Sequence, residues 1–170
     1  MQKGDYIALR NTYRPARTRC VFVLESPPAH SGYVYDPNGR VSEVLFRAFM
    51  RLLDLNPDTK DEGLCALADA GWILVNAVYV PVNKLPDSEA DRMIRENYRN
   101  LVRDLEGVMR GDKRTPVILV KANVVRLLEE PLQKDGFRVL NRGVMIPFPM
   151  HYHADAFQER TKKLLDGISL

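Results

Sequence analysis

The stretch at residues 20–37, CVFVLESPPAHSGYVYDP, decides how the rest of the chain is interpreted. It opens with a continuous apolar run at residues 20–24, which is typical of a strand covered on both faces of its sheet. Glu25 and Ser26 follow this run directly, and two prolines after them end the backbone pairing because proline has no N–H group. We therefore expect a central parallel strand with polar groups at its carboxyl end, where open α/β sheets bind ligands.

The loop after this strand carries chemically useful side chains within seven residues: His30, Tyr33, Tyr35 and Asp36. The two phenol rings can stack on a flat ligand, and the alternative is that they cover an edge of the core.

Further apolar runs predict the remaining strands. They lie at residues 72–80, 117–120, 137–140 and 144–146, and the last two flank a turn signal at residues 141–143. Apolar residues three and four positions apart predict helices between and after them: 42–56, 59–70, 88–110, 124–131 and a terminal helix through Phe157 and Leu164. Ser42 is the expected N-cap of the first, and Ser88 with Asp91 has capping-box spacing. Alternating strands and helices favour a single domain (residues 1–170), a three-layer α/β/α sandwich with a central, mostly parallel four-stranded sheet.

Composition limits the class of protein. The chain has 170 residues, of which 45% are hydrophobic and 28% charged, and its formal net charge is only +3. Residues 1–19 are polar and rich in arginine, and no apolar run approaches the roughly 20 residues that cross a bilayer, so we expect a cytoplasmic protein without a membrane partner. Two cysteines, Cys20 and Cys65, have no metal-ligand spacing. We expect a monomer.

Positive charge is concentrated near the start of the chain. Arg10, Arg14, Arg17 and Arg19 fall within ten residues, with Tyr13 among them. This spacing fits an edge that contacts phosphates, and the alternative is a solvated approach to the first strand.

Two further strand ends carry polar groups. Asn76 interrupts an apolar run, and its amide offers a donor and an acceptor side by side, the arrangement that reads the edge of a nucleobase. The alternative is a structural asparagine that pins a loop. Glu25 is a candidate base or water-orienting group, or it bonds to amides of its own loop. His151 and His153 follow the last predicted strand and are candidate acid/base, anion-binding or metal-binding groups.

The order of these motifs resembles the uracil-DNA glycosylase superfamily. The resemblance rests on residues 24–28 after the first strand, on Tyr35 at the position of a stacking aromatic, on Asn76 at a strand end, and on residues 148–150 leading to the two histidines. The chain departs from the family pattern because Pro28 replaces a glycine and Phe148 stands where a histidine is expected. The cysteines of the iron–sulfur members are also absent.

The resemblance implies a DNA glycosylase that hydrolyses the N-glycosidic bond of a flipped-out, deaminated base, and it requires no cofactor. Glu25 would orient water, and His151 or His153 would stabilise the leaving base. The base would contact Ser26, Pro27, His30, Tyr33, Tyr35, Asn76 and Phe148. The DNA backbone would contact Arg10, Arg14, Arg17 and Lys121.

Two other functions remain open at this point. The first is a non-catalytic module that binds nucleic acid or a nucleotide on the same fold. The second is a metal-dependent hydrolase in which His151, His153 and a carboxylate such as Asp36 or Asp155 hold the metal.

Overall fold

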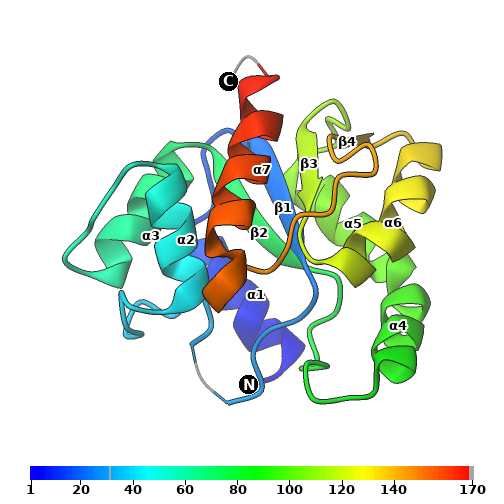
Figure 1. Ribbon diagram of the computed structural model, residues 1–170, viewed down its shortest axis with the longest axis horizontal. Helices are drawn as coiled ribbons and strands as arrows, with labels where there is room; N and C mark the ends of the chain where they lie inside the picture. The colour runs from blue at the N-terminus through cyan, green and yellow to red at the C-terminus, as the bar shows by residue number, and fades with distance from the viewer. Residues whose placement is uncertain (31, 169–170) are drawn as a thin grey trace.

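Four parallel strands form the centre of the molecule in the computed structural model, which describes residues 1–30 and 32–168 (Figure 1). They are β1 (Cys20–Leu24), β2 (Trp72–Asn76), β3 (Pro116–Leu119) and β4 (Arg138–Val139), in the order β2-β1-β3-β4. Every residue of β1 is buried, which explains why its sequence is apolar without alternation. The predicted fold class, a three-layer α/β/α sandwich around a parallel sheet, is confirmed.

Helices cover both faces of the sheet (Figure 1). One face packs against α1 (Lys3–Thr12), α2 (Val44–Leu52), α3 (Lys60–Asp69) and α7 (Ala154–Asp166), through a core that includes Phe22 and Leu74. The other face packs against α4 (Asp87–Glu96), α5 (Tyr98–Val108) and α6 (Ala122–Lys134), through a core that includes Val23 and Val75. Successive strand residues point to opposite faces, so β1, β2 and β3 each contribute to both cores.

The long helix predicted over residues 88–110 is two helices. The chain breaks at Asn97, whose side-chain amide donates a hydrogen bond of 2.6 Å to the carbonyl oxygen of Ala77. This bond ties the α4–α5 junction to the chain just after β2. The predicted caps also differ, because α4 follows Pro86, with Ser88 inside the helix, and α2 follows Glu43 rather than Ser42.

The strand predicted at residues 144–146 is wrong, because the described chain is irregular there. Beyond the end of β4, the side chain of Asn141 forms the hydrogen bonds to β3 that a longer strand would form. Its side-chain oxygen accepts from the backbone N–H of Leu119 at 2.8 Å, and its amide nitrogen donates to the carbonyl oxygens of Leu119 and Val144, at 2.9 Å each. One buried amide thus satisfies the backbone groups that a longer neighbouring strand would have used.

The strand predicted at residues 72–80 is shorter than expected. Backbone bonds continue briefly past Asn76, since the N–H groups of Ala77 and Val78 donate to Leu24 and Glu25. The neighbouring chain then reaches Pro27, which cannot donate a hydrogen bond, so regular pairing ends. The helix predicted to end near Pro131 instead continues to Lys134. No helix among the described residues is long and apolar enough to span a membrane.

Candidate functional site

The strand order creates a topological switch point between the neighbouring central strands β1 and β3. The chain leaves β1 toward α2 and α3 on one face of the sheet, and it leaves the adjacent β3 toward α6 on the other face. The carboxyl ends of two parallel strands whose connections diverge form a topological switch point, the usual ligand site of an open α/β sheet. The first residues after β1 and β3 are therefore the first candidates for function.

Glu25 lies at this switch point and joins the two strand ends. Its carboxylate accepts a short hydrogen bond from the Lys121 Nζ, which also forms a salt bridge, and one of 2.6 Å from the Asn123 amide nitrogen. The Glu25 side chain is only 9% exposed, whereas that of Lys121 is 41% exposed. The cluster of Glu25, Lys121 and Asn123, called the switch-point triad below, thus places a nearly buried anion at the switch point and a partly exposed cation beside it.

Lys121 has an unusual backbone conformation. Its φ is 86° and its ψ is 139°. Residues other than glycine avoid this region because of the Cβ atom. The conformation is held on both sides, because the Lys121 N–H donates to the carbonyl of Ile146 at 2.7 Å and the Lys121 carbonyl accepts the first helical bond of α6. Strained residues of this kind concentrate at ligand-binding and catalytic sites.

The loop after β1 is tied to the loop after β2. The Ser26 hydroxyl oxygen accepts from the N–H of Val82 at 3.2 Å, and the Lys84 Nζ lies 2.5 Å from the His30 Nε2. Pro27, which lies between Ser26 and His30 in the sequence, is buried, whereas His30 is exposed. These contacts hold the loop that follows Glu25 beside the chain that follows β2.

The placement of both loop tyrosines corrects the expectation that their rings are open to a base. Tyr35 is fully buried, and its hydroxyl oxygen accepts from the N–H of Leu74 at 2.8 Å. Tyr33 is 5% exposed, and its hydroxyl donates to the carbonyl of Tyr6. Burial raises the pKa of both phenols. They are core residues that support the loop, which is the alternative that the sequence left open.

Asn76 lies at the end of β2 and is in register with Leu24, so strand alternation places it on the face of Phe22 and Leu74, whereas Glu25 is the next residue along the β1 chain. It is 4% exposed, and its amide forms no hydrogen bond with residues 1–30 or 32–168. It lines a recess of about 10 Å³, shared with Tyr79 and Asn100, among others. This volume is near the minimum for one water molecule, so a base reaches the amide only if neighbouring side chains move.

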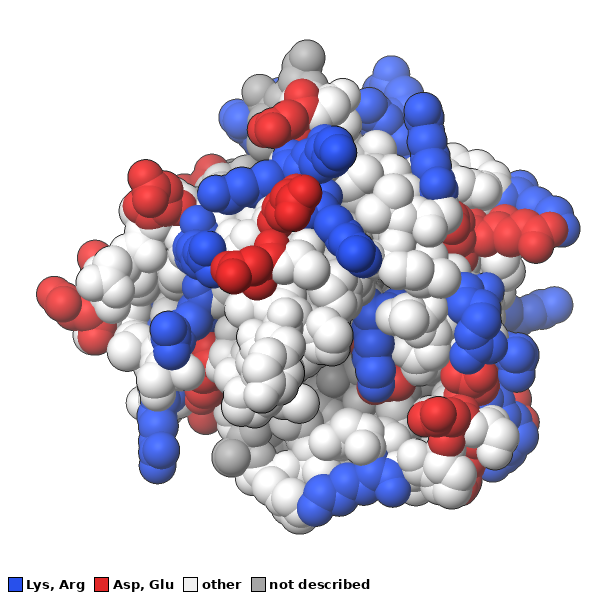
Figure 2. Space-filling view, in the orientation of Figure 1, with Lys and Arg blue, Asp and Glu red and all other residues white. Residues whose placement is uncertain are grey.

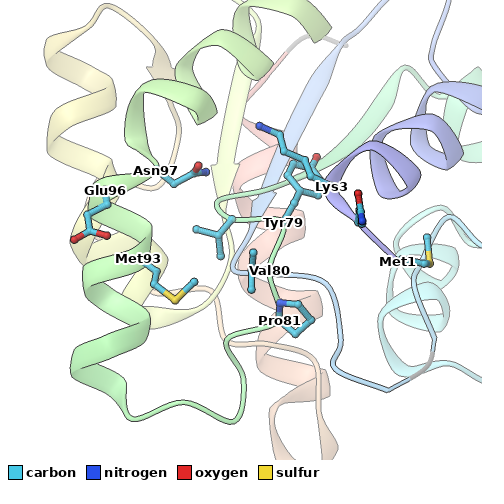
Figure 3. A pocket seen from close by; sticks show the side chains of 10 residues that line it. Met1, Lys3, Tyr79, Val80, Pro81, Met93, Glu96 and Asn97 are labelled. Carbon is cyan, nitrogen blue, oxygen red and sulfur yellow. The ribbon is translucent and has the colours of Figure 1, made fainter.

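A larger, open pocket of about 560 Å³ adjoins this recess (Figure 3). It lies between the start of α1 and the α4–α5 junction, with Lys3 on one side and Met93 and Asn97 on the other, and Tyr79 and Val80 line it from the chain after β2. Its lining does not include Glu25. The sequence-predicted contacts Glu25 and Asn76 therefore face separate spaces.

The late histidines lie at the beginning of the last helix. His151 and His153 form the short 3₁₀ helix η1 (His151–His153), and both are exposed, as is the intervening Tyr152. Phe148 is half-buried in the preceding loop, which contacts Lys121 through the carbonyl of Ile146. This loop borders the switch point, but no hydrogen bond or ion pair within the described chain joins either histidine to Glu25.

The predicted phosphate-binding arginines are not grouped around Glu25. Arg10 is 2% exposed and forms a two-pronged ion pair with Asp104, with N–O distances of 2.7 and 2.8 Å, so it fastens α1 to α5 and is not available to a phosphate. Arg14 and Arg17 lie before β1, at the amino ends of the strands. Lys121 is the only one of the four predicted backbone contacts that lies at the switch point.

Sequence reasoning missed Asn123, although a signal for it existed. The residues that follow the apolar run at 117–120 are Lys121, Ala122 and Asn123, and they repeat the pattern of a buried strand followed directly by polar groups that singled out Glu25. The described residues contain no group of three or more histidine, cysteine, aspartate or glutamate side chains placed to hold a metal ion. The grouping expected for a metal-dependent hydrolase is therefore not found in the described chain.

Comparisons with protein-family models, with curated proteins and with solved structures found no match for this chain. The fold and the switch-point triad thus define its class: a parallel α/β sandwich with a carboxylate–lysine–amide cluster at the topological switch point.

Proposed function

We propose that this protein hydrolyses the N-glycosidic bond of a damaged base in nucleic acid, the reaction of the uracil-DNA glycosylase superfamily that its sequence resembles. The position of Glu25 carries this proposal. It is a nearly buried carboxylate at the carboxyl end of β1, at the topological switch point, which is the position where open α/β sheets usually bind ligands. Asn76 at the end of the adjacent strand supports it only through the sequence pattern, since its amide takes part only if the neighbouring side chains move.

The chemistry needs a negative charge beside the sugar. When the bond between the sugar C1′ and the base nitrogen breaks, the electron pair leaves with the base and positive charge develops on the sugar ring. Water then adds its hydroxyl group to C1′, and its proton goes to the departing base. A carboxylate at this position stabilises the cationic sugar and orients the water through a hydrogen bond.

Lys121 and Asn123 support the charged form of Glu25 without using all of its capacity. A carboxylate has about four lone-pair positions, and these two donors occupy two of them. The exposed Lys121 ammonium group is also able to contact a phosphate of the substrate beside the switch point. Binding of the backbone and exposure of the Glu25 carboxylate to the sugar would then be linked through the same lysine.

The test is base release from labelled single- and double-stranded oligonucleotides that carry uracil, hypoxanthine or xanthine, followed by alkaline cleavage of the abasic sites. We expect Glu25→Gln, which preserves the shape of the side chain, to lower the rate about 10²- to 10⁴-fold. Glu159→Gln, an exposed position on α7, is the matched control and should retain the parent rate. Circular dichroism of all variants checks that they are folded.

A second candidate is a non-catalytic module that binds nucleic acid. It is favoured by one observation, that both oxygens of Glu25 already accept hydrogen bonds from Lys121 and Asn123. If the parent binds oligonucleotides but releases no base from any of them, this second function replaces the first. Equal rates for the parent and for Glu25→Gln would show that the carboxylate has no catalytic role.

A further inference from the structure

A cluster of arginines lies at the amino ends of the strands, on the side of the sheet away from the switch point. The approach to β1 carries Arg14, Arg17 and Arg19, the approach to β3 carries Arg110, Lys113 and Arg114, and β4 begins at Arg138. Hydrogen bonds bring these segments together, because the Thr18 hydroxyl donates to the carbonyl of Val108 at 2.7 Å and the Arg138 N–H donates to the carbonyl of Lys113. We call these seven residues the amino-edge cluster.

The segments that carry the cluster have a higher net positive charge than the whole chain. Residues 13–19, 109–115 and 135–138 contain seven arginines or lysines and two aspartates, so their net charge is +5, whereas the complete chain has +3. The remainder of the molecule is therefore slightly negative. Figure 2 shows lysine and arginine side chains, with acidic ones among them, at the upper end of the molecule, where the strands of Figure 1 begin and α7 ends.

Most of this charge is not used within the molecule. The exposed guanidinium groups of Arg17, Arg19, Arg110 and Arg138 form no hydrogen bond or salt bridge with the described residues 1–30 and 32–168. The acidic neighbour Asp112 is already neutralised, because Arg114 holds it through two side-chain hydrogen bonds of 2.9 and 3.2 Å, and this contact lowers the pKa of the Asp112 carboxyl. Four arginines of these segments are thus exposed to solvent without a partner among the described residues.

The geometry of the amino-edge cluster suits a phosphate backbone and separates it from the switch point. Neighbouring strands are about 4.8 Å apart, so the starts of β1 and β4, two strands away, lie roughly 10 Å from one another. The five residues of β1 place the cluster about 16 Å from Glu25. A stretch of backbone phosphates bound along the amino-edge cluster therefore does not reach the switch point at the same time.

We propose that the amino-edge cluster is a second nucleic-acid-binding surface, which holds the phosphate backbone of a strand or duplex segment other than the one at the switch point. The contacts are charge contacts to phosphates and carry no sequence preference. The choice of nucleic acid as the polyanion rests on the proposed function, whereas the surface itself rests on the placement of the arginines.

The experiment measures binding of a labelled, undamaged duplex of roughly three helical turns by fluorescence anisotropy over a series of salt concentrations. The variant is Arg17→Gln/Arg19→Gln/Arg138→Gln. The control removes the same charge elsewhere, Arg47→Gln/Arg95→Gln/Arg99→Gln, at exposed positions of α2, α4 and α5. We expect the first variant to bind at least about 10-fold more weakly at low salt and to lose about 3 from the slope of log affinity against log salt. The control variant should retain the parent slope.

Two results would overturn the proposal. One is equal loss of affinity in both triple variants, which would mean that general charge rather than this surface binds the duplex. The other is stronger binding of the parent to phosphatidylserine vesicles than to the duplex, with the same dependence on the three arginines, because the partner would then be an anionic membrane surface. Base release from a short oligonucleotide, which tests Glu25, is expected to be unchanged in the amino-edge variant, so the two proposals fail independently.

Discussion

Lys121 combines an unusual backbone conformation with a side chain that takes part in the proposed chemistry. Its positive φ places a Cβ atom where L-residues are disfavoured, and its side chain pairs with Glu25 at the switch point. A glycine at position 121 would remove the disfavoured Cβ atom, and it would also remove the ion pair with Glu25. A lysine at this position is understandable if its ammonium group is needed beside Glu25.

The two features of Lys121 can be separated by a pair of substitutions. Both Lys121→Ala and Lys121→Gly remove the ion pair with Glu25, but only alanine keeps the Cβ atom. We expect the glycine variant to have a free energy of unfolding about 1–2 kcal/mol higher than the alanine variant, measured by urea denaturation. Equal stabilities would show that the backbone is not strained there. Both variants should lose base release by comparable factors.

At the scale of elements, a buried ion pair fixes the loop between β1 and α2. Lys60, the first residue of α3, is 1% exposed, and its Nζ donates to the Tyr33 carbonyl at 2.9 Å and to the Glu43 carboxylate at 2.7 Å. Gly39 makes room for this contact, since a Cβ atom there would lie 2.4 Å from the carboxylate and 2.8 Å from the ammonium nitrogen. The loop that carries the tyrosines is thus anchored to α3.

Removal of one partner should be costly because Glu43 is mostly buried. The Glu43 side chain is 18% exposed, and without Lys60 its charge has no compensation. We expect Lys60→Met to lower the free energy of unfolding by about 2–4 kcal/mol, and added Glu43→Gln to recover part of that loss, as a urea denaturation cycle would show. Lys134→Met, which breaks an exposed pair with Glu130, should change stability by less than about 0.5 kcal/mol. Similar losses at both sites would contradict the burial argument.

At the scale of the whole molecule, tyrosine burial predicts how the protein responds to alkali. Burial, followed by the hydrogen bond to Asp61, raises the pKa of Tyr13 to about 12, and burial also raises the pKa of Tyr33, Tyr35, Tyr79 and Tyr98. Unfolded tyrosines ionise near pH 10, so above that pH the unfolded chain loses protons that the folded chain keeps. The contribution of these tyrosines to the free energy of unfolding is therefore fully present below about pH 10, and it is lost as the pH rises toward 12.

Alkaline titration followed by tyrosinate absorbance and by circular dichroism checks this expectation. Five of the seven tyrosines should ionise together with the loss of helical signal, rather than before it. Ionisation of most tyrosines in a protein that remains folded would mean that these rings are accessible to solvent, contrary to their placement.

The sequence by itself determined the strand positions that define the fold. The runs at residues 20–24, 72–75 and 117–119 are apolar on every residue because strands of a parallel sheet are covered on both faces, and the polar residues that follow the first two runs, Glu25 and Asn76, stood out at strand ends. The helix break at Asn97 and the role of Asn141 were not visible, because each depends on a hydrogen bond to a distant backbone group.

Only the tertiary structure decided which side chains are available and which meet. Tyr35 and Arg10 look like binding residues in sequence, yet one lies in the core and the other is paired with Asp104. Asn123 joins Glu25 across about a hundred residues of chain, and Arg17 and Arg138 share an edge although they are farther apart still. Periodicity reports the environment of each segment separately, whereas these contacts follow from strand order and helix packing, which are properties of the folded chain as a whole.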